Sequence, residues 1–112
     1  MVRREQIEQF ARRVAEEFHP DKIILFGSYA EGAPNEDSDV DLLVIMPHKG
    51  RPAEQATLIR ERVPRAFPMD LLVRDPEVLR QRLGWGDFFL REVVEKGITL
   101  YESANIGVVA KS

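Results

Sequence analysis

The strongest constraint on the fold is a short motif that the chain contains twice. Asp-Leu-Leu-Val occupies residues 41–44, inside the apolar run of residues 40–46, and it occurs again at residues 70–73. Apart from Asp41, the first run consists of apolar residues, which predicts a central strand covered on both faces. The fold must therefore contain a buried sheet in which two strands begin beside a carboxylate.

The segments around these runs predict further strands and helices. Apolar residues recur at helical spacing in residues 3–18, and Asp75-Pro76 is typical of an N-cap followed by the first residue of a helix. In residues 28–38, which are rich in turn-forming residues, Ser28 and Glu31 have the spacing of a capping box on one short helical turn. We expect strands at 22–26, 40–46, 69–73 and 98–101, and longer helices at 3–18, 53–63, 76–83 and 87–96.

Composition restricts the class of protein. The 112 residues, 44% hydrophobic and 31% charged, indicate one globular domain, which we place at residues 1–102 with a C-terminal tail at 103–112. The absence of cysteine excludes thiolate nucleophiles and thiolate zinc sites, and the net charge of -3 argues against a broad nucleic-acid surface. No apolar run has the length of a membrane span, so we expect a cytoplasmic protein.

Asp39 and Asp41 are two residues apart at the start of the predicted central strand. Their side chains share a face, with carbons roughly 6.6 Å apart, and at an effective dielectric of about 20 they repel each other by on the order of 2.5 kcal/mol. For an isolated pair, an exposed strand end is the plainer explanation. Asp70 makes a functional explanation more plausible, because it begins another apolar strand in the same way. If the two strands are neighbours in register, three carboxylates meet at one end of the sheet.

Three converging carboxylates would form a hard oxygen site suited to magnesium or manganese. A pair of such ions can clamp a phosphoryl centre and activate an attacking hydroxyl. Gly27 allows close approach of the backbone to a ligand, and Ser28 at a helix start offers its hydroxyl and N–H groups to phosphate oxygens. Gly-Ser is also an ordinary strand-to-helix turn, so the prediction depends on its combination with the acids.

Gly27-Ser28, a spacer of ten residues, Asp39-x-Asp41 and Asp70 together resemble the minimal nucleotidyltransferase (MNT) family of the DNA polymerase beta superfamily. The resemblance covers residues 22–46 and, less closely, 69–73. It implies an α/β fold, with a small mixed sheet of about four strands flanked by helices. It also implies that Gly27 and Ser28 bind the triphosphate, that Asp39 and Asp41 bind two magnesium ions, and that Asp70 completes the metal site and helps activate the acceptor.

The resemblance further implies a magnesium-dependent enzyme that transfers a nucleoside monophosphate, AMP from ATP, to a hydroxyl group. In this branch the acceptor is often a helical HEPN toxin, which would make this chain an antitoxin within a hetero-oligomer. Two alternatives stay open. One is a weak nucleotide-binding module that neutralises its partner by binding alone, and the other is an antibiotic-modifying transferase, which needs an acceptor pocket usually built by a further domain.

Glu31 departs from the family pattern, because the branch usually has a basic residue at this position near the triphosphate. The candidates for replacing the missing positive charge are Lys49, Arg51 and Arg74. For each of these three residues, a solvated surface charge is the plainer explanation.

Trp85 lies between two glycines and is followed closely by Phe88 and Phe89. Such a dense group of aromatic residues in a small domain belongs either to the core or to a binding surface. We expect it to be partly exposed and to bind the partner.

Overall fold

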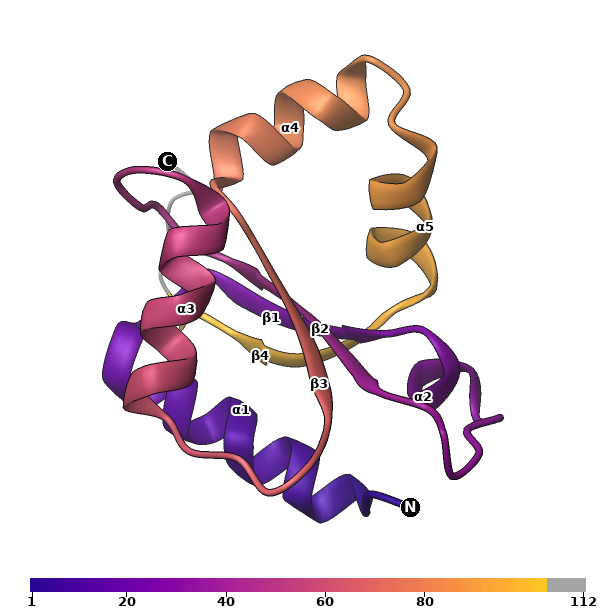
Figure 1. Ribbon diagram of the computed structural model, residues 1–112. Helices are drawn as coiled ribbons and strands as arrows, with labels where there is room; N and C mark the ends of the chain where they lie inside the picture. Colours follow the sequence, from indigo (N-terminus) through magenta and orange to yellow (C-terminus); the bar gives the residue numbers. More distant parts are fainter. Residues whose placement is uncertain (105–112) are drawn as a thin grey trace.

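A four-stranded sheet with the order β3-β2-β1-β4 is at the centre of the computed structural model, which describes residues 1–104 (Figure 1). β2 pairs with β1 antiparallel and with β3 parallel, so the sheet is mixed, as expected. Every predicted strand and longer helix is present, and the bounds agree within one residue. The elements are α1 (Arg4–Phe18), β1 (Lys22–Phe26), α2 (Ser28–Glu31), β2 (Val40–Ile45), α3 (Pro52–Arg62), β3 (Met69–Arg74), α4 (Pro76–Gly84), α5 (Phe88–Lys96) and β4 (Ile98–Glu102).

The alternation of side chains along the strands divides the core into two layers. The larger layer lies between the sheet and helices α1 and α3, with Leu42 and Val44 as its central β2 residues. The smaller layer joins Leu43 and Ile45 of β2 to buried residues of α4 and α5. Asp41 is two residues before Leu43, so its side chain points to the face of the smaller layer. The site is therefore on the side of the sheet that α4 and α5 cover in part (Figure 1).

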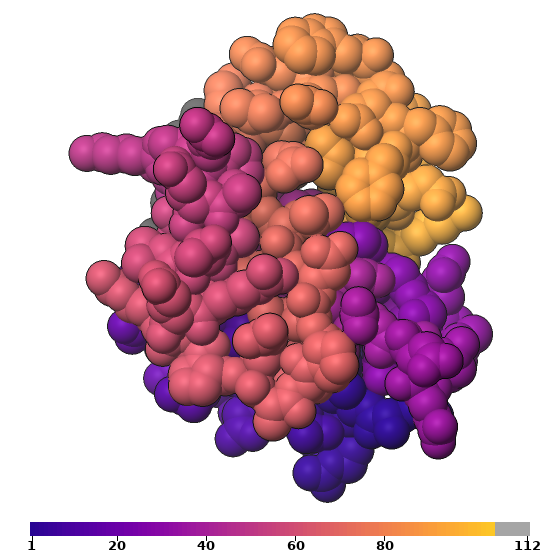
Figure 2. Space-filling view, viewed as in Figure 1, coloured from indigo at the N-terminus to yellow at the C-terminus, as the bar shows by residue number. Residues whose placement is uncertain are grey.

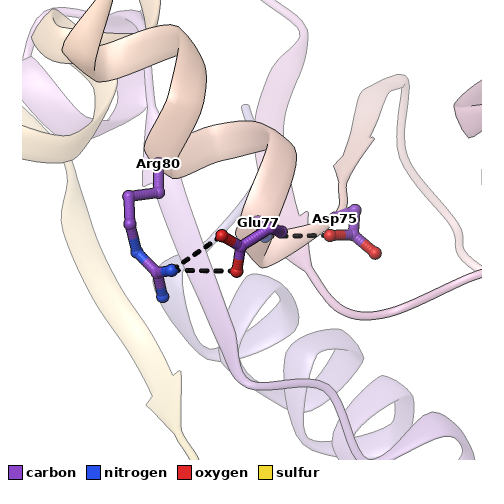
Figure 3. A network of polar contacts seen from close by, with 3 residues as sticks. All are labelled: Asp75, Glu77 and Arg80. Carbon is purple, nitrogen blue, oxygen red and sulfur yellow. Dashed lines mark hydrogen bonds and ion pairs between the residues drawn. The ribbon is translucent and has the colours of Figure 1, made fainter.

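α4 begins directly after β3, at the N-cap that the sequence predicted. The Asp75 carboxylate accepts a hydrogen bond of 2.8 Å from the N–H of Glu77 (Figure 3). One turn later the Glu77 carboxylate pairs with Arg80 at 2.8 Å, although both side chains are exposed. An exposed pair of this kind contributes at most about 1 kcal/mol, whereas loss of a cap typically costs about 1 kcal/mol.

The predicted capping box of Ser28 and Glu31 is wrong. Gly27 is the N-cap residue of α2, and no side chain caps this helix. Gly27 has φ 74° and ψ -156°, a region of backbone conformation essentially restricted to glycine. Ser28 is the first helical residue, so its hydroxyl is not the N-cap acceptor of α2.

The C-terminal end of the described chain follows β4, where the N–H of Ser103 donates a hydrogen bond of 2.9 Å to the carbonyl of Asp21. Residues 105–112 of the predicted tail lie outside the described residues. Within residues 1–104, no helix is both long and apolar enough to cross a membrane.

Candidate active site

The parallel pairing of β2 with β3 brings two acids together. Asp41 and Asp70 are partners in the register of this pair, and neighbouring strands lie about 4.8 Å apart. Asp39 precedes β2 by one residue, and the N–H of Val40 donates a hydrogen bond of 3.0 Å to the carbonyl of Pro68. The expectation that the acids of the two strands meet at one end of the sheet is confirmed for Asp41 and Asp70.

Asp41 is the electrostatic centre of this group. Burial raises the pKa of its carboxyl, and the negative charges of Asp70 and then Asp39 raise that pKa further. All three effects disfavour the charged form of Asp41. Both other acids are therefore close enough to act on Asp41, and a bound cation would oppose this upward shift of its pKa.

The acid group is not by itself a closed metal cage. Within the described part of the chain, no three His, Cys, Asp or Glu side chains are placed so that they can hold a metal ion. The chemistry of the donors nevertheless fits magnesium, which binds one or two carboxylates, keeps several waters and takes further oxygens from substrate phosphates. Asp41 and Asp70 fit one side of such a site.

Gly27 joins the turn after β1 to the acids. A Cβ atom added to Gly27 would meet the Asp41 carboxylate, and the positive φ of this residue already disfavours any other side chain. The preceding residue, Phe26, is the cross-strand partner of Asp41. The two halves of the predicted motif, Gly27-Ser28 and the paired acids, are therefore adjacent in space.

A pocket of about 240 Å³ opens beside the same turn, between β1, α2 and α5. Phe26 and Phe89 line it and form an edge-to-face contact with ring centroids 5.8 Å apart. Its charged residues are Glu31 from α2 and Glu92 and Lys96 from α5. Sequence reasoning missed this pocket because it depends on how α5 packs on β1, and no local pattern shows that packing.

The residues predicted to replace the missing positive charge lie at the wrong end of the sheet. Arg74 ends β3 and pairs with Ile45, while Lys49 and Arg51 follow the end of β2. Ile45 is four positions after Asp41, which corresponds to roughly 13 Å along the strand. Among the described residues that line the pocket with Gly27 and Glu31, the positively charged one is Lys96.

Comparison with known proteins identifies the family. The family model described as a nucleotidyltransferase domain matches residues 7–100. A candidate protein adenylyltransferase of Methanocaldococcus jannaschii is 31% identical over 78 residues, which cover 70% of this chain and 76% of that relative. The chain belongs to the nucleotidyltransferase domain family, and it is a nucleotidyltransferase. The family resemblance inferred from the motif is thereby confirmed.

Solved structures have the same fold. A candidate nucleotidyltransferase of Sulfolobus solfataricus has a TM-score of 0.61 at 19% identity, covering 88% of this chain and 78% of that one. A toxin-antitoxin with AMP-PNP has a TM-score of 0.58 at 21% identity, covering 91% and 78%. A mutant of the toxin-antitoxin MntA-HpeT has a TM-score of 0.57 at 18% identity, also covering 91% and 78%. At these identities the likeness is one of fold.

Proposed function

We propose that this protein transfers AMP from ATP to a hydroxyl group of a partner protein in the cytoplasm, using magnesium that Asp39, Asp41 and Asp70 would hold once the phosphates of ATP complete the site. The observation that carries the proposal is the pairing of Asp41 with Asp70 beside the Gly27-Ser28 turn. A relative named as a candidate protein adenylyltransferase supports both the adenylyl group and the protein acceptor. The neighbour crystallised with AMP-PNP, an analogue of ATP, supports ATP as the donor.

Each residue has a defined role in the proposed reaction. The Ser28 hydroxyl and the N–H groups of the Gly27-Ser28 turn bind oxygens of the triphosphate. Asp39 and Asp41 would chiefly hold two magnesium ions, which would offset the charge on the phosphates when bound. The acceptor oxygen attacks the α-phosphorus while Asp70 takes the hydroxyl proton. The bond from the α-phosphorus to the bridging oxygen breaks, and pyrophosphate leaves.

An exposed aromatic surface, formed by Trp85, Phe88 and Phe89, is the proposed docking surface for the acceptor. It spans the turn between α4 and α5 and the start of α5, in the orange part of Figure 2. The three residues are 79%, 77% and 50% exposed. Phe89 also contacts Phe26, so the surface borders the pocket beside the acids. Aromatic residues often dominate the binding energy of interfaces.

We further propose that the partner is a helical HEPN-type toxin and that the present protein is its antitoxin within a hetero-oligomer. The fold shared with the toxin-antitoxin MntA-HpeT supports this choice. The alternative, neutralisation of the partner by binding alone, is favoured by Glu31, which places a negative charge where the branch usually has a positive one.

The test uses the product of the neighbouring gene, provided that it is a small all-helical protein. We expect its intact mass to increase by one adenylyl group after incubation with the present protein, ATP and magnesium. Changing both Asp39 and Asp41 to Asn should abolish the increase. An unchanged partner mass with the native protein would contradict the proposal. If the double variant still neutralised the partner, binding alone would be the function.

A further inference from the structure

The proposed site has a deficit of positive charge. A nucleoside triphosphate is polyanionic, whereas the nearest ionisable residues from the sheet and α2 are Asp39, Asp41, Asp70 and Glu31. Magnesium can offset the charges of the phosphates nearest the acids. The outermost phosphate is not offset in this way. Lys49, Arg51 and Arg74 do not reach it, because they lie at the other end of the strands. Among the described residues that line the pocket at the Gly27 turn, Lys96 is the one cation.

Lys96 is the last residue of α5 and pairs with a carboxylate of its own helix. Its Nζ pairs with Oε1 of Glu92 at 2.9 Å, one turn earlier on the same helix. The hydrogen bond with Glu92 raises the pKa of Lys96 most, and the charge of Glu31 across the pocket also contributes. The ammonium group therefore remains positively charged at neutral pH and is close to both α2 and α5.

We infer that Lys96 binds the terminal phosphate of the nucleoside triphosphate and exchanges its contact with Glu92 for phosphate oxygens when the substrate enters. This inference rests on the proposed function. Gly27 belongs to the pocket and also lies against Asp41, so the turn leads from the acids into the pocket. A triphosphate whose α-phosphate lies at the acids can follow the turn, with its outer phosphate directed toward Lys96.

The exchange is energetically reasonable. The contacting side chains of Lys96 and Glu92 are 68% and 49% exposed, and exposed pairs of this type are weak. A phosphate group offers a lysine stronger, charge-assisted hydrogen bonds than a solvated carboxylate pair. The competing explanation is an ordinary i,i+4 pair that stabilises the end of α5, for which nucleotide binding would be irrelevant.

The experiment measures binding of ATP, ADP and AMP to the full chain by titration calorimetry with magnesium and no acceptor. We expect Lys96→Met to weaken ATP binding about tenfold, ADP binding less, and AMP binding hardly at all. Lys22→Met is the control, because Lys22 also forms an ion pair with a glutamate, Glu102 at 3.8 Å, but at the far end of β1. This control should bind all three nucleotides as the native protein does, and Lys96→Arg should keep most of the preference for ATP.

The outcomes separate the inference from the proposed function. If the native protein prefers ATP and Lys96→Met keeps that preference in full, the inference is wrong and the proposed function stands. If the native protein shows no preference for ATP over AMP, both fail. A purely structural role of Lys96 would lower the melting temperature and weaken all three nucleotides equally, and that result would also overturn the inference.

Discussion

Removing the charge of Asp41 should stabilise the metal-free protein, although the residue is proposed to be essential for activity. Asp41→Asn keeps the size of the side chain while it removes a partly buried charge that faces Asp70 and Asp39. Two charges about 5 Å apart repel each other by about 3 kcal/mol at an effective dielectric of 20 and by about 0.8 kcal/mol in bulk water. Because Asp70 and Asp39 are exposed, the gain should lie toward the lower of these limits, at about 1 kcal/mol.

A gain of this size should raise the melting temperature by about 4 °C in a domain of this length. Thermal unfolding with a chelator present measures it. Asp75→Asn is the matched control, because an asparagine caps α4 as well as the aspartate does, and this variant should melt close to the native protein. A lower melting temperature for Asp41→Asn, or the same rise in the control, would refute the argument from repulsion.

The pH dependence of this difference follows from the direction of the pKa shift. The pKa of Asp41 in the folded protein is raised above its ordinary value of 3.8, so the folded state binds its proton more tightly than the unfolded state does. The associated stability is complete below pH 3.8 and is lost as the pH rises through the raised pKa. The advantage of Asp41→Asn over the native protein should therefore be small in acid and largest at neutral pH.

Three further predictions concern the metal, the turn and the docking surface. Magnesium should raise the melting temperature of the native protein but not that of Asp41→Asn, and equal shifts would exclude this residue as a ligand. Gly27→Ala should lower the free energy of unfolding, measured with urea, by about 2 kcal/mol or more, because alanine is strained at this positive φ and its Cβ meets Asp41. A loss of stability near zero would contradict this geometry. Replacing Trp85 and Phe88 by Ala should weaken partner binding by about 2 kcal/mol or more, as measured by calorimetry, and should leave ATP binding unchanged. The control Leu58→Ala, on the exposed side of α3, should change neither binding reaction. If the double variant still binds the partner as the native protein does, the docking surface is elsewhere.

The fold and the pairing of the acids were predictable because both depend on short-range patterns. Apolar runs bounded by turn residues define the strands, and the repeated Asp-Leu-Leu-Val places Asp41 and Asp70 at the same phase of their strands. A shift of one residue would turn the buried side chains of either strand to the other face, so the hydrophobic pattern strongly restricts the register. The sequence left open whether the two strands are neighbours, and the parallel pairing of β2 with β3 supplies that condition.

The surroundings of the acids were not predictable in the same way. The capping box failed because the left-handed φ of Gly27 moves the start of α2 by one residue, and the spacing of Ser28 and Glu31 does not report that angle. Lys96 was missed because it lies almost seventy residues after Gly27 in the sequence, and only the packing of α5 against β1 brings the two together. Arg74 cannot take the place of the missing basic residue at the site, because β3 carries it to the opposite end of the sheet from Asp70.

The central claim is that the acids of β2 and β3 hold a metal-bound nucleotide together. Calorimetric titration of manganese into the protein with saturating AMP-PNP, compared between the native chain and Asp41→Asn, tests it most directly. We predict that the native protein binds the metal and that the variant, although more stable, loses this binding. Equal manganese affinity in both proteins would contradict the claim.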